Sequence, residues 1–99
     1  ATRIERVSTT GVGGGQSERL VNLCRHFGAT VYLSGSAARD YLDVPLFDAQ
    51  GATVQWHDYT HPVYPQQHGA FLPYMSAIDL MLNCGPDSRA VLEGRAALR

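Results

Sequence analysis

The sequence of 99 residues contains no lysine, so all eight of its basic residues are arginines. The absence of lysine excludes Schiff-base chemistry and a P-loop lysine from this chain. The formal net charge is −1, and the arginines are spread along the sequence without forming a basic cluster. Proteins that bind nucleic acid usually carry a basic face. We therefore expect no nucleic-acid partner.

Cysteines and long apolar runs are also scarce. Cys24 and Cys84 are the two cysteines, and one distant pair is a poor disulfide framework, so we expect both to be reduced and buried. No apolar run approaches the ~20 residues that a helix needs to cross a bilayer. The N-terminus lacks the charged region and apolar block of a signal peptide. These absences predict a soluble, cytoplasmic chain without a membrane span.

The residues that are present predict a first series of elements. Residues 3–8 alternate apolar and polar side chains, which indicates a short strand, and residues 11–15 form a glycine-rich loop. A helix then begins with Ser17 as its N-cap and ends at Gly28. One face of that helix is apolar and consists of Leu20, Leu23, Cys24 and Phe27.

Two more strands are predicted at residues 30–34 and 52–57. The first is apolar on successive residues, as expected when both faces of a sheet are covered. The second alternates with period two. Between them, Ser36 caps a short helix, and Pro45 begins another that ends at Gly51.

The last third begins with a long loop. Residues 58–73 contain three prolines and show no periodicity, and a loop of that length is usually functional or disordered; its aromatic residues argue against disorder. Ser76 and Asp79 form a capping box for a helix that ends at Gly85. The apolar stripe of this helix consists of Ile78, Met81 and Leu82, and Pro86 begins a final helix that frays over residues 95–99.

Strands that alternate with helices predict an α/β fold with a parallel sheet. We expect one α/β domain over residues 1–99, with about three strands in a small βαβ-type sheet and flanking helices. Such a small sheet leaves an exposed edge. This fits a fragment of a larger three-layer fold, or a protomer that forms a homodimer.

Ligands of parallel sheets bind beyond the carboxyl ends of the strands, where three loops would meet. The turn of Ser34, Gly35 and Ser36 has two interpretations. It is a tight strand-to-helix turn, or it binds an anion or a carbonyl group at the helix N-terminus, with Arg39 as counter-charge. Asp40 is equally a solvent-facing helix residue. The glycine-rich loop matches neither a dinucleotide fingerprint nor a Walker A motif, which favours a linker over a phosphate loop.

The long loop supplies further polar candidates. The spacing of His57, His61 and His68 is common to many loops, so we predict no metal site. Polar contacts, general acid–base catalysis and a structural role are the interpretations that stay open for these histidines. Tyr64 packs the loop or contacts a ligand, and Gln66 bonds the backbone or a ligand. Helix capping explains Asp79, and a helix C-terminus explains Asn83.

Three segments together resemble the C-terminal portion of the WbqC-like protein family. They are SERLVNLCRHFGATVYLSGSAARDYLD (17–43), VQWHDYTHPVYPQQHGAF (54–71) and MSAIDLMLNCGPDS (75–88). The resemblance implies a bacterial cytoplasmic protein of surface-polysaccharide (O-antigen) biosynthesis. It implies an amide-forming transferase or ligase that places an aminoacyl group, glycyl in particular, on a nucleotide-linked amino sugar. The alternative is a non-catalytic domain that binds a sugar nucleotide or a partner enzyme.

The resemblance also selects residues and sets a limit. The matching polar positions are Ser34, Gly35, Arg39, Asp40, Tyr64, Gln66, His68, Asp79 and Asn83. With the loop argument, it predicts that the substrate is bound by Ser34, Gly35, Ser36, Arg39, Tyr64 and Gln66. His68 or Asp40 would handle the amine proton. Family members carry a preceding half that is absent here, so the chain alone is expected to be inactive; whether ATP takes part stays open.

Overall fold

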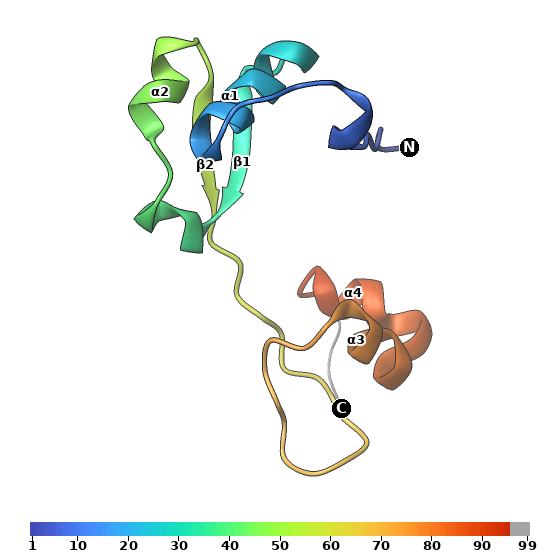
Figure 1. Ribbon diagram of the computed structural model, residues 1–99. Helices are drawn as coiled ribbons and strands as arrows, with labels where there is room; N and C mark the ends of the chain where they lie inside the picture. Colours follow the sequence, from blue (N-terminus) through green and yellow to red (C-terminus); the bar gives the residue numbers. More distant parts are fainter. Residues whose placement is uncertain (96–99) are drawn as a thin grey trace. The chain divides into compact units, whose positions relative to one another are not determined.

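Two compact units make up the chain in the computed structural model, which describes residues 1–95 (Figure 1). The units are Ala1–Asp58 and Tyr59–Arg99. The helix end expected at residues 95–99 lies outside the described residues except for Arg95, which follows the last helix as irregular chain. The single domain over residues 1–99 stays a prediction.

The first unit begins with helix α1 (Gln16–Phe27), which ends where the sequence predicts. Gly28 takes a left-handed backbone conformation with φ of +64°, which costs little because glycine has no Cβ. Its position lets the Ala29 N–H donate to the carbonyl of Cys24 at 2.8 Å. The predicted C-terminal glycine is therefore confirmed.

The predicted N-cap of α1 is wrong, because Gly15 occupies that position and Ser17 lies inside the helix. Ser17 is buried, and its hydroxyl oxygen accepts a hydrogen bond from the Asp43 N–H at 3.0 Å. Asp43 directly precedes helix α2 (Val44–Ala49), with Pro45 in its first turn. Ser17 thus ties α1 to the start of α2, which is a tertiary role for a residue type that usually caps helices locally.

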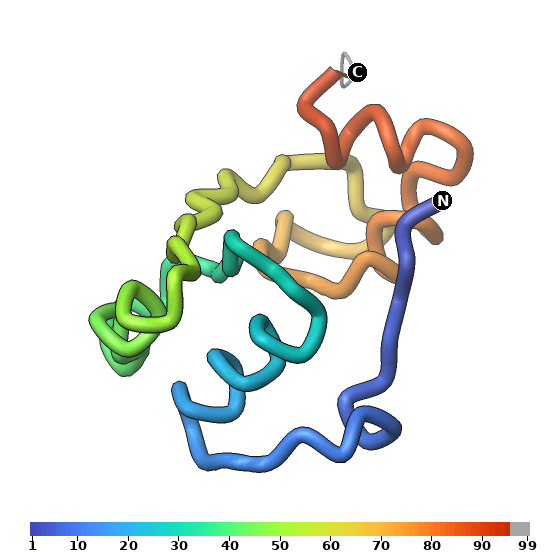
Figure 2. The backbone as a smooth tube through the Cα atoms, turned by 90° about the horizontal axis from the view of Figure 1, so that it is seen from above, coloured from blue at the N-terminus to red at the C-terminus, as the bar shows by residue number. Residues whose placement is uncertain are grey.

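The sheet has two parallel strands, β1 (Val31–Gly35) and β2 (Thr53–His57), paired in register from Val31 with Thr53 to Gly35 with His57. The 3-10 helix η2 (Ser36–Asp40) and α2 connect them. The α/β class is confirmed, but the described residues contain two strands and not about three. Residues 3–8 form no strand; they run extended into the short 3-10 helix η1 (Val7–Thr9) (Figure 2). Ile4, whose alternation suggested the strand, is 88% exposed and has no core to cover.

The core of the first unit is centred on Phe47, which is fully buried. Its ring stacks against Tyr32 with centroids 5.0 Å apart. The other members of this cluster are Val21, Cys24, Ala38, Leu42 and Ala52. Trp56 and Val54 pack against it from the inner face of the sheet.

The outer face of the sheet is uncovered by the described residues of its own unit. Val31 and Leu33 on that face are 45% and 63% exposed. The prediction that both faces are covered is therefore wrong within this unit. The successive apolar residues of β1 predicted that both faces of the sheet are covered, whereas α1 and α2 pack on one face only.

The second unit combines the long loop with two helices, α3 (Ala77–Cys84) and α4 (Ser88–Leu92), joined by the 3-10 helix η3 (Gly85–Asp87). As predicted, no helix or strand lies between β2 and α3. Its small core contains Tyr64, Leu80 and Val91, with Phe71 and Cys84 packed against them.

The apolar stripe predicted for α3 does not face that core. Ile78, Met81 and Leu82 are 62%, 57% and 83% exposed, and Leu80 is the buried residue of the helix. Both cysteines are free, with Cys24 buried and Cys84 half-buried. Among residues 1–95, no helix combines the length and apolarity that a membrane crossing requires.

Candidate functional site

The turn after β1 opens the short helix η2, as the sequence predicts. Gly35 is the N-cap residue of η2, and Ser36 is its first helical residue. The prediction that Ser36 caps this helix is therefore wrong. A 3-10 helix of five residues has only a small dipole, so an anion would gain little from the helix itself. Any anion binding at Ser34, Gly35 and Ser36 therefore depends on Arg39.

Arg39 lies at the carboxyl end of the sheet and contacts the residue that follows β2. Its Nη2 donates to Asp58 Oδ1 at 3.3 Å and Oδ2 at 3.0 Å, and the guanidinium lies over the Trp56 ring at 5.3 Å. The ends of the two strands thus meet as expected for a parallel pair. Both bonds come from Nη2, and a guanidinium has five N–H donors, so Arg39 can bind an anion while it keeps Asp58. Asp40 is exposed at the end of η2.

Backbone carbonyl groups tie the glycine-rich loop to α1. Asn22 Nδ2 donates to the Gly13 carbonyl at 3.2 Å, and Arg19 Nε donates to the Gly14 carbonyl at 3.0 Å. Phosphate loops use N–H groups, not carbonyl groups, to hold an anion. These contacts favour the linker interpretation.

Asp79 is the centre of a hydrogen-bond network in the second unit. Its Oδ2 accepts from the Tyr64 hydroxyl at 2.7 Å and from Gln66 Nε2 at 3.1 Å. Its Oδ1 accepts from Asn83 Nδ2 at 3.2 Å. The capping-box interpretation of Asp79 is therefore wrong. Ser76 does cap α3, by accepting from the Ile78 N–H, but the Asp79 carboxylate binds the long loop instead.

The same amides hold the loop backbone on both sides of His68. Gln66 exchanges two hydrogen bonds with Leu72: Nε2 donates to its carbonyl at 3.0 Å, and Oε1 accepts from its N–H at 2.8 Å. Asn83 Oδ1 accepts from the Gln67 N–H at 2.8 Å. The predicted backbone bond of Gln66 is thus confirmed. Asn83 does more than end a helix, because it joins α3 to the loop.

A cleft of about 330 Å³ lies beside this network. It combines side-chain amides, a carboxylate and an imidazole with apolar side chains; the lining residues are Gln66, Gln67, His68, Leu72, Met75, Asp79, Leu82 and Asn83. The volume is at the lower end of the range for small-molecule sites. Three predicted residues, Tyr64, Gln66 and His68, thus belong to this unit, whereas Ser34, Gly35, Ser36, Arg39 and Asp40 belong to the first.

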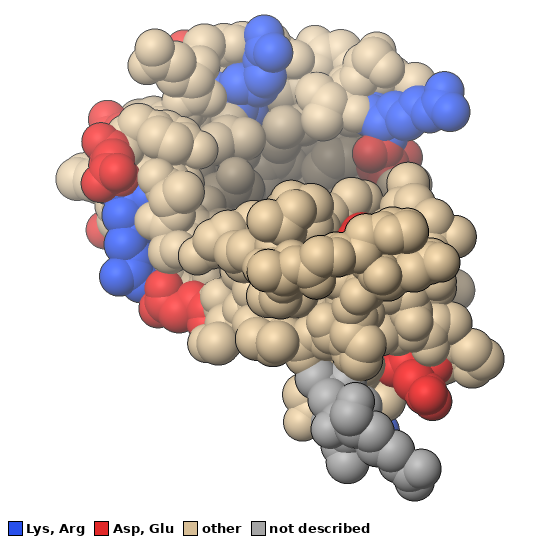
Figure 3. All heavy atoms as spheres, turned by 90° about the horizontal axis from the view of Figure 1, so that it is seen from below, with Lys and Arg blue, Asp and Glu red and all other residues tan. Residues whose placement is uncertain are grey.

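Metal ligands are not clustered in residues 1–95, and basic side chains are not clustered on the face seen in Figure 3. No three His, Cys, Asp or Glu side chains are grouped as metal ligands in the part of the chain that the structure describes. On the face seen in Figure 3, arginines are scattered, and some of them lie beside acidic side chains. The polar chemistry of the second unit therefore rests on amides, on the Asp79 carboxylate and on His68.

Tyr64 provides a pH-dependent test of the network. Its hydrogen bond to the Asp79 carboxylate raises the pKa of Tyr64 above the ordinary tyrosine value, and burial adds to this rise. Because the folded state holds this proton more tightly than the unfolded state, the stabilisation is complete below about pH 10 and is lost as the pH rises further. We expect the urea midpoint of the second unit to fall as the pH rises above about 10. NMR of the Leu80 and Val91 methyl groups would follow that unit.

The Tyr64→Phe variant is the matched control, because it keeps the ring and removes the titrating hydroxyl. It should be less stable at neutral pH and lose less stability over the same alkaline range. An equal alkaline loss in both proteins would contradict the assignment.

Comparisons with known proteins identify one family and one similar relative. A model of the WbqC-like protein family matches residues 1–91. The chain is 38% identical over 89 residues to the uncharacterized protein Rv1507c of Mycobacterium tuberculosis, an alignment that covers 89% of this chain and 38% of the relative. The chain thus spans well under half the length of that relative. No solved structure matches the chain significantly.

Proposed function

Because the chain belongs to the WbqC-like protein family, we propose that it forms part of an amide-forming transferase or ligase. The enzyme would attach an aminoacyl group, glycyl in particular, to the amine of a nucleotide-linked amino sugar during bacterial surface-polysaccharide biosynthesis. The observation that carries this proposal is the fixed loop around His68. A reactive imidazole at a cleft is useful only if its backbone is held, and Gln66 and Asn83 hold it.

The cleft supplies the groups that such a reaction needs. The amine nitrogen of the sugar attacks the carbonyl carbon of an activated aminoacyl donor, so that a C–N bond forms and the bond to the donor's leaving group breaks. His68 would accept the proton that the amine loses. Leu72, Met75 and Leu82 would pack against the apolar face of the sugar ring, and Gln67 would bond its hydroxyl groups.

Arg39 in the first unit is a separate candidate anion site. Arg39 has N–H donors beyond those that bind Asp58, and a phosphate oxygen would accept from them. Ser34, Gly35 and Ser36 precede it in the same turn and would add hydroxyl and backbone donors. Asp40 is the second candidate to take the amine proton.

The test incubates the full-length protein with a nucleotide-linked amino sugar, labelled glycine and ATP, and measures the adduct by mass spectrometry. We expect a glycyl adduct, and His68→Ala should lower its rate by about 10²–10⁴-fold. His26→Ala, on the exposed end of α1, is the matched control and should leave the rate unchanged. The proposal fails if no adduct forms and no nucleotide binds. The 99-residue chain by itself is expected to show no turnover.

A second candidate is a non-catalytic domain that binds a sugar nucleotide or a partner enzyme, or that pairs with a second copy. Val31 and Leu33 favour it, because they lie on the same uncovered face of β1 and a contiguous exposed apolar patch marks a protein-binding surface. It predicts that a nucleotide sugar raises the melting temperature without turnover, and that Arg39→Ala abolishes the shift. Light scattering would separate the dimer from the monomer.

A further inference from the structure

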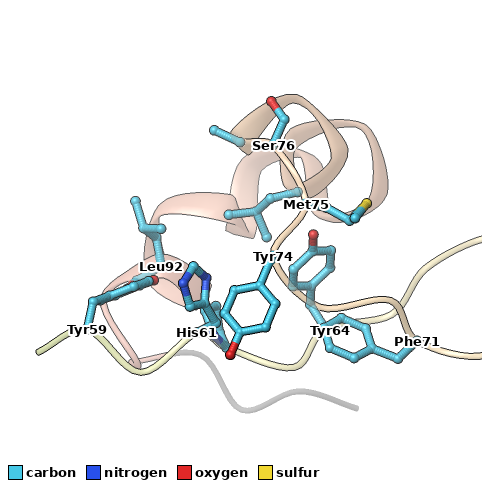
Figure 4. A pocket seen from close by; sticks show the side chains of 11 residues that line it. Tyr59, His61, Tyr64, Phe71, Tyr74, Met75, Ser76 and Leu92 are labelled. Atoms are coloured by element: carbon cyan, nitrogen blue, oxygen red, sulfur yellow. The ribbon is translucent and has the colours of Figure 1, made fainter. Parts of the chain in front are cut away.

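A second, smaller pocket lies in the Tyr59–Arg99 unit and has a different character from the cleft at His68. Its volume is about 130 Å³, and Figure 4 shows aromatic and aliphatic side chains around it. The main lining residues are Tyr59, His61, Phe71, Tyr74, Leu80 and Leu92. Of the residues assigned to the transfer reaction, only Met75 and Tyr64, whose hydroxyl is bonded to Asp79, also line it.

Two rings of the pocket contact each other under an unusual backbone constraint. The His61 and Tyr74 rings meet edge to face, with centroids 4.6 Å apart. Tyr74 has φ of +60°, a left-handed conformation that residues with a Cβ rarely adopt, and its side chain is 76% exposed. Residues held in such conformations cluster at ligand sites. An exposed ring held at a pocket in this way is available to stack on a ligand.

The polar groups of the pocket are largely engaged within the protein. The Tyr59 hydroxyl donates to the Leu92 carbonyl at 3.1 Å, and Ser76 Oγ accepts from the Ile78 N–H at 3.1 Å. A sugar ring carries several hydroxyl groups that would each need a partner on entering. A planar ring with polar atoms only at its edge needs far fewer. The lining therefore favours an aromatic heterocycle over a sugar.

Size restricts the heterocycle further. An apolar cavity of about 150 Å³ holds one benzene molecule, so about 130 Å³ accommodates a single six-membered ring. The pocket is partly open, so the second ring of a bicyclic purine would extend beyond the lining side chains, and a single ring fits the pocket better. We propose that this pocket binds the pyrimidine base of a nucleotide, with Tyr74 stacked on the base and His61 hydrogen-bonded to its edge.

This inference rests on the proposed function in one respect, namely that the substrate is a nucleotide-linked sugar. Met75 lines both this pocket and the cleft at His68. The base and the amino sugar of one substrate would thus be bound by neighbouring parts of the same unit. The enzyme would then prefer pyrimidine nucleotide sugars to their purine counterparts.

The experiment titrates uridine, adenosine and N-acetylglucosamine separately into the protein and follows the Tyr74 and His61 ring signals by NMR. Nucleosides without phosphate are used so that arginines contribute nothing to binding. We expect uridine to bind at least about tenfold more tightly than adenosine or the sugar. Tyr74→Gly should weaken uridine binding by about fivefold or more, because base stacking on an aromatic ring is lost.

The variants keep this test independent of folding. Glycine suits φ of +60°, so Tyr74→Gly removes the ring without straining the backbone. Tyr74→Phe keeps the ring and should restore binding, and Tyr41→Ala, which removes an exposed tyrosine of the first unit, should not change it.

Four results would overturn the inference: uridine failing to bind, adenosine binding as tightly as uridine, the sugar binding best, or uridine binding unchanged in Tyr74→Gly. If uridine fails to bind while the full-length protein still forms the glycyl adduct, the base pocket is wrong and the proposed function stands. If uridine binds as expected but no adduct forms, the base pocket stands and the transferase is wrong.

Discussion

Phe47→Ala is expected to destabilise the first unit by about 3–5 kcal/mol. The Phe47 ring is fully buried, stacks on Tyr32 and lies at the centre of the cluster that joins α1, α2 and the sheet. Its removal leaves a cavity that these elements cannot close without losing their own contacts. The total free energy of unfolding of a small domain is about 5–15 kcal/mol, so the variant should be close to unfolding at 37 °C.

Trp56 makes this measurement specific. It is the single tryptophan of the chain and packs against the same cluster, so its fluorescence during urea unfolding reports the first unit alone. Phe27→Ala is the matched control, because that ring is 42% exposed, and its removal should cost about 1 kcal/mol or less. Equal losses in the two variants would show that Phe47 is not the centre of the core.

Asp79→Ala is expected to release the long loop from α3. It removes the acceptor of the Tyr64 hydroxyl and of the Gln66 amide, and both bonds are part-buried. The lost Gln66 bond alone is expected to cost about 1 kcal/mol. If the cleft at His68 binds the amino sugar, the variant should also raise the KM for that substrate.

Methyl NMR of Leu80 and Val91 during urea unfolding measures the stability loss, and the adduct assay measures the KM. Asp87→Ala is the control, since Asp87 is an exposed aspartate of the same unit at the start of α4. It should change the stability of the second unit by no more than about 0.5 kcal/mol and leave the KM essentially unchanged. If the KM rises equally in Asp87→Ala, the Asp79 hydrogen-bond network is not part of the binding site.

The helices and strands could be predicted wherever local signals agree. Gly28 and Pro45 set one end of their helices by backbone sterics that depend on no distant residue. The alternation in residues 52–57 predicts a strand, which forms over Thr53–His57, and Val54 and Trp56 are its inward residues. The strand expected at residues 3–8 failed because alternation shows only that a segment could pair, whereas a strand forms only if another strand lies beside it.

The errors at polar residues share one physical cause. Ser17 and Asp79 both fit local capping patterns, but each binds a partner more than ten residues away. A tertiary partner that fixes a whole loop can outweigh a cap that satisfies one N–H, and the sequence does not show which partner is near. The aromatic pocket was missed for a similar reason. The aromatic residues of the long loop were visible, but the left-handed backbone of Tyr74 was not.

The direct pairing of β1 with β2 also bears on how the first unit acquires its structure. Only η2 and α2 separate the two strands along the chain, and the partners of the ladder, from Val31 and Thr53 to Gly35 and His57, keep one constant sequence separation. A parallel pair cannot form until its crossover is in place, so the loop-closure entropy is lost before the ladder hydrogen bonds form, and such pairing is slow. The ladder and the Phe47 cluster that packs on it are therefore expected to form late in the folding of the first unit, after α2 has formed.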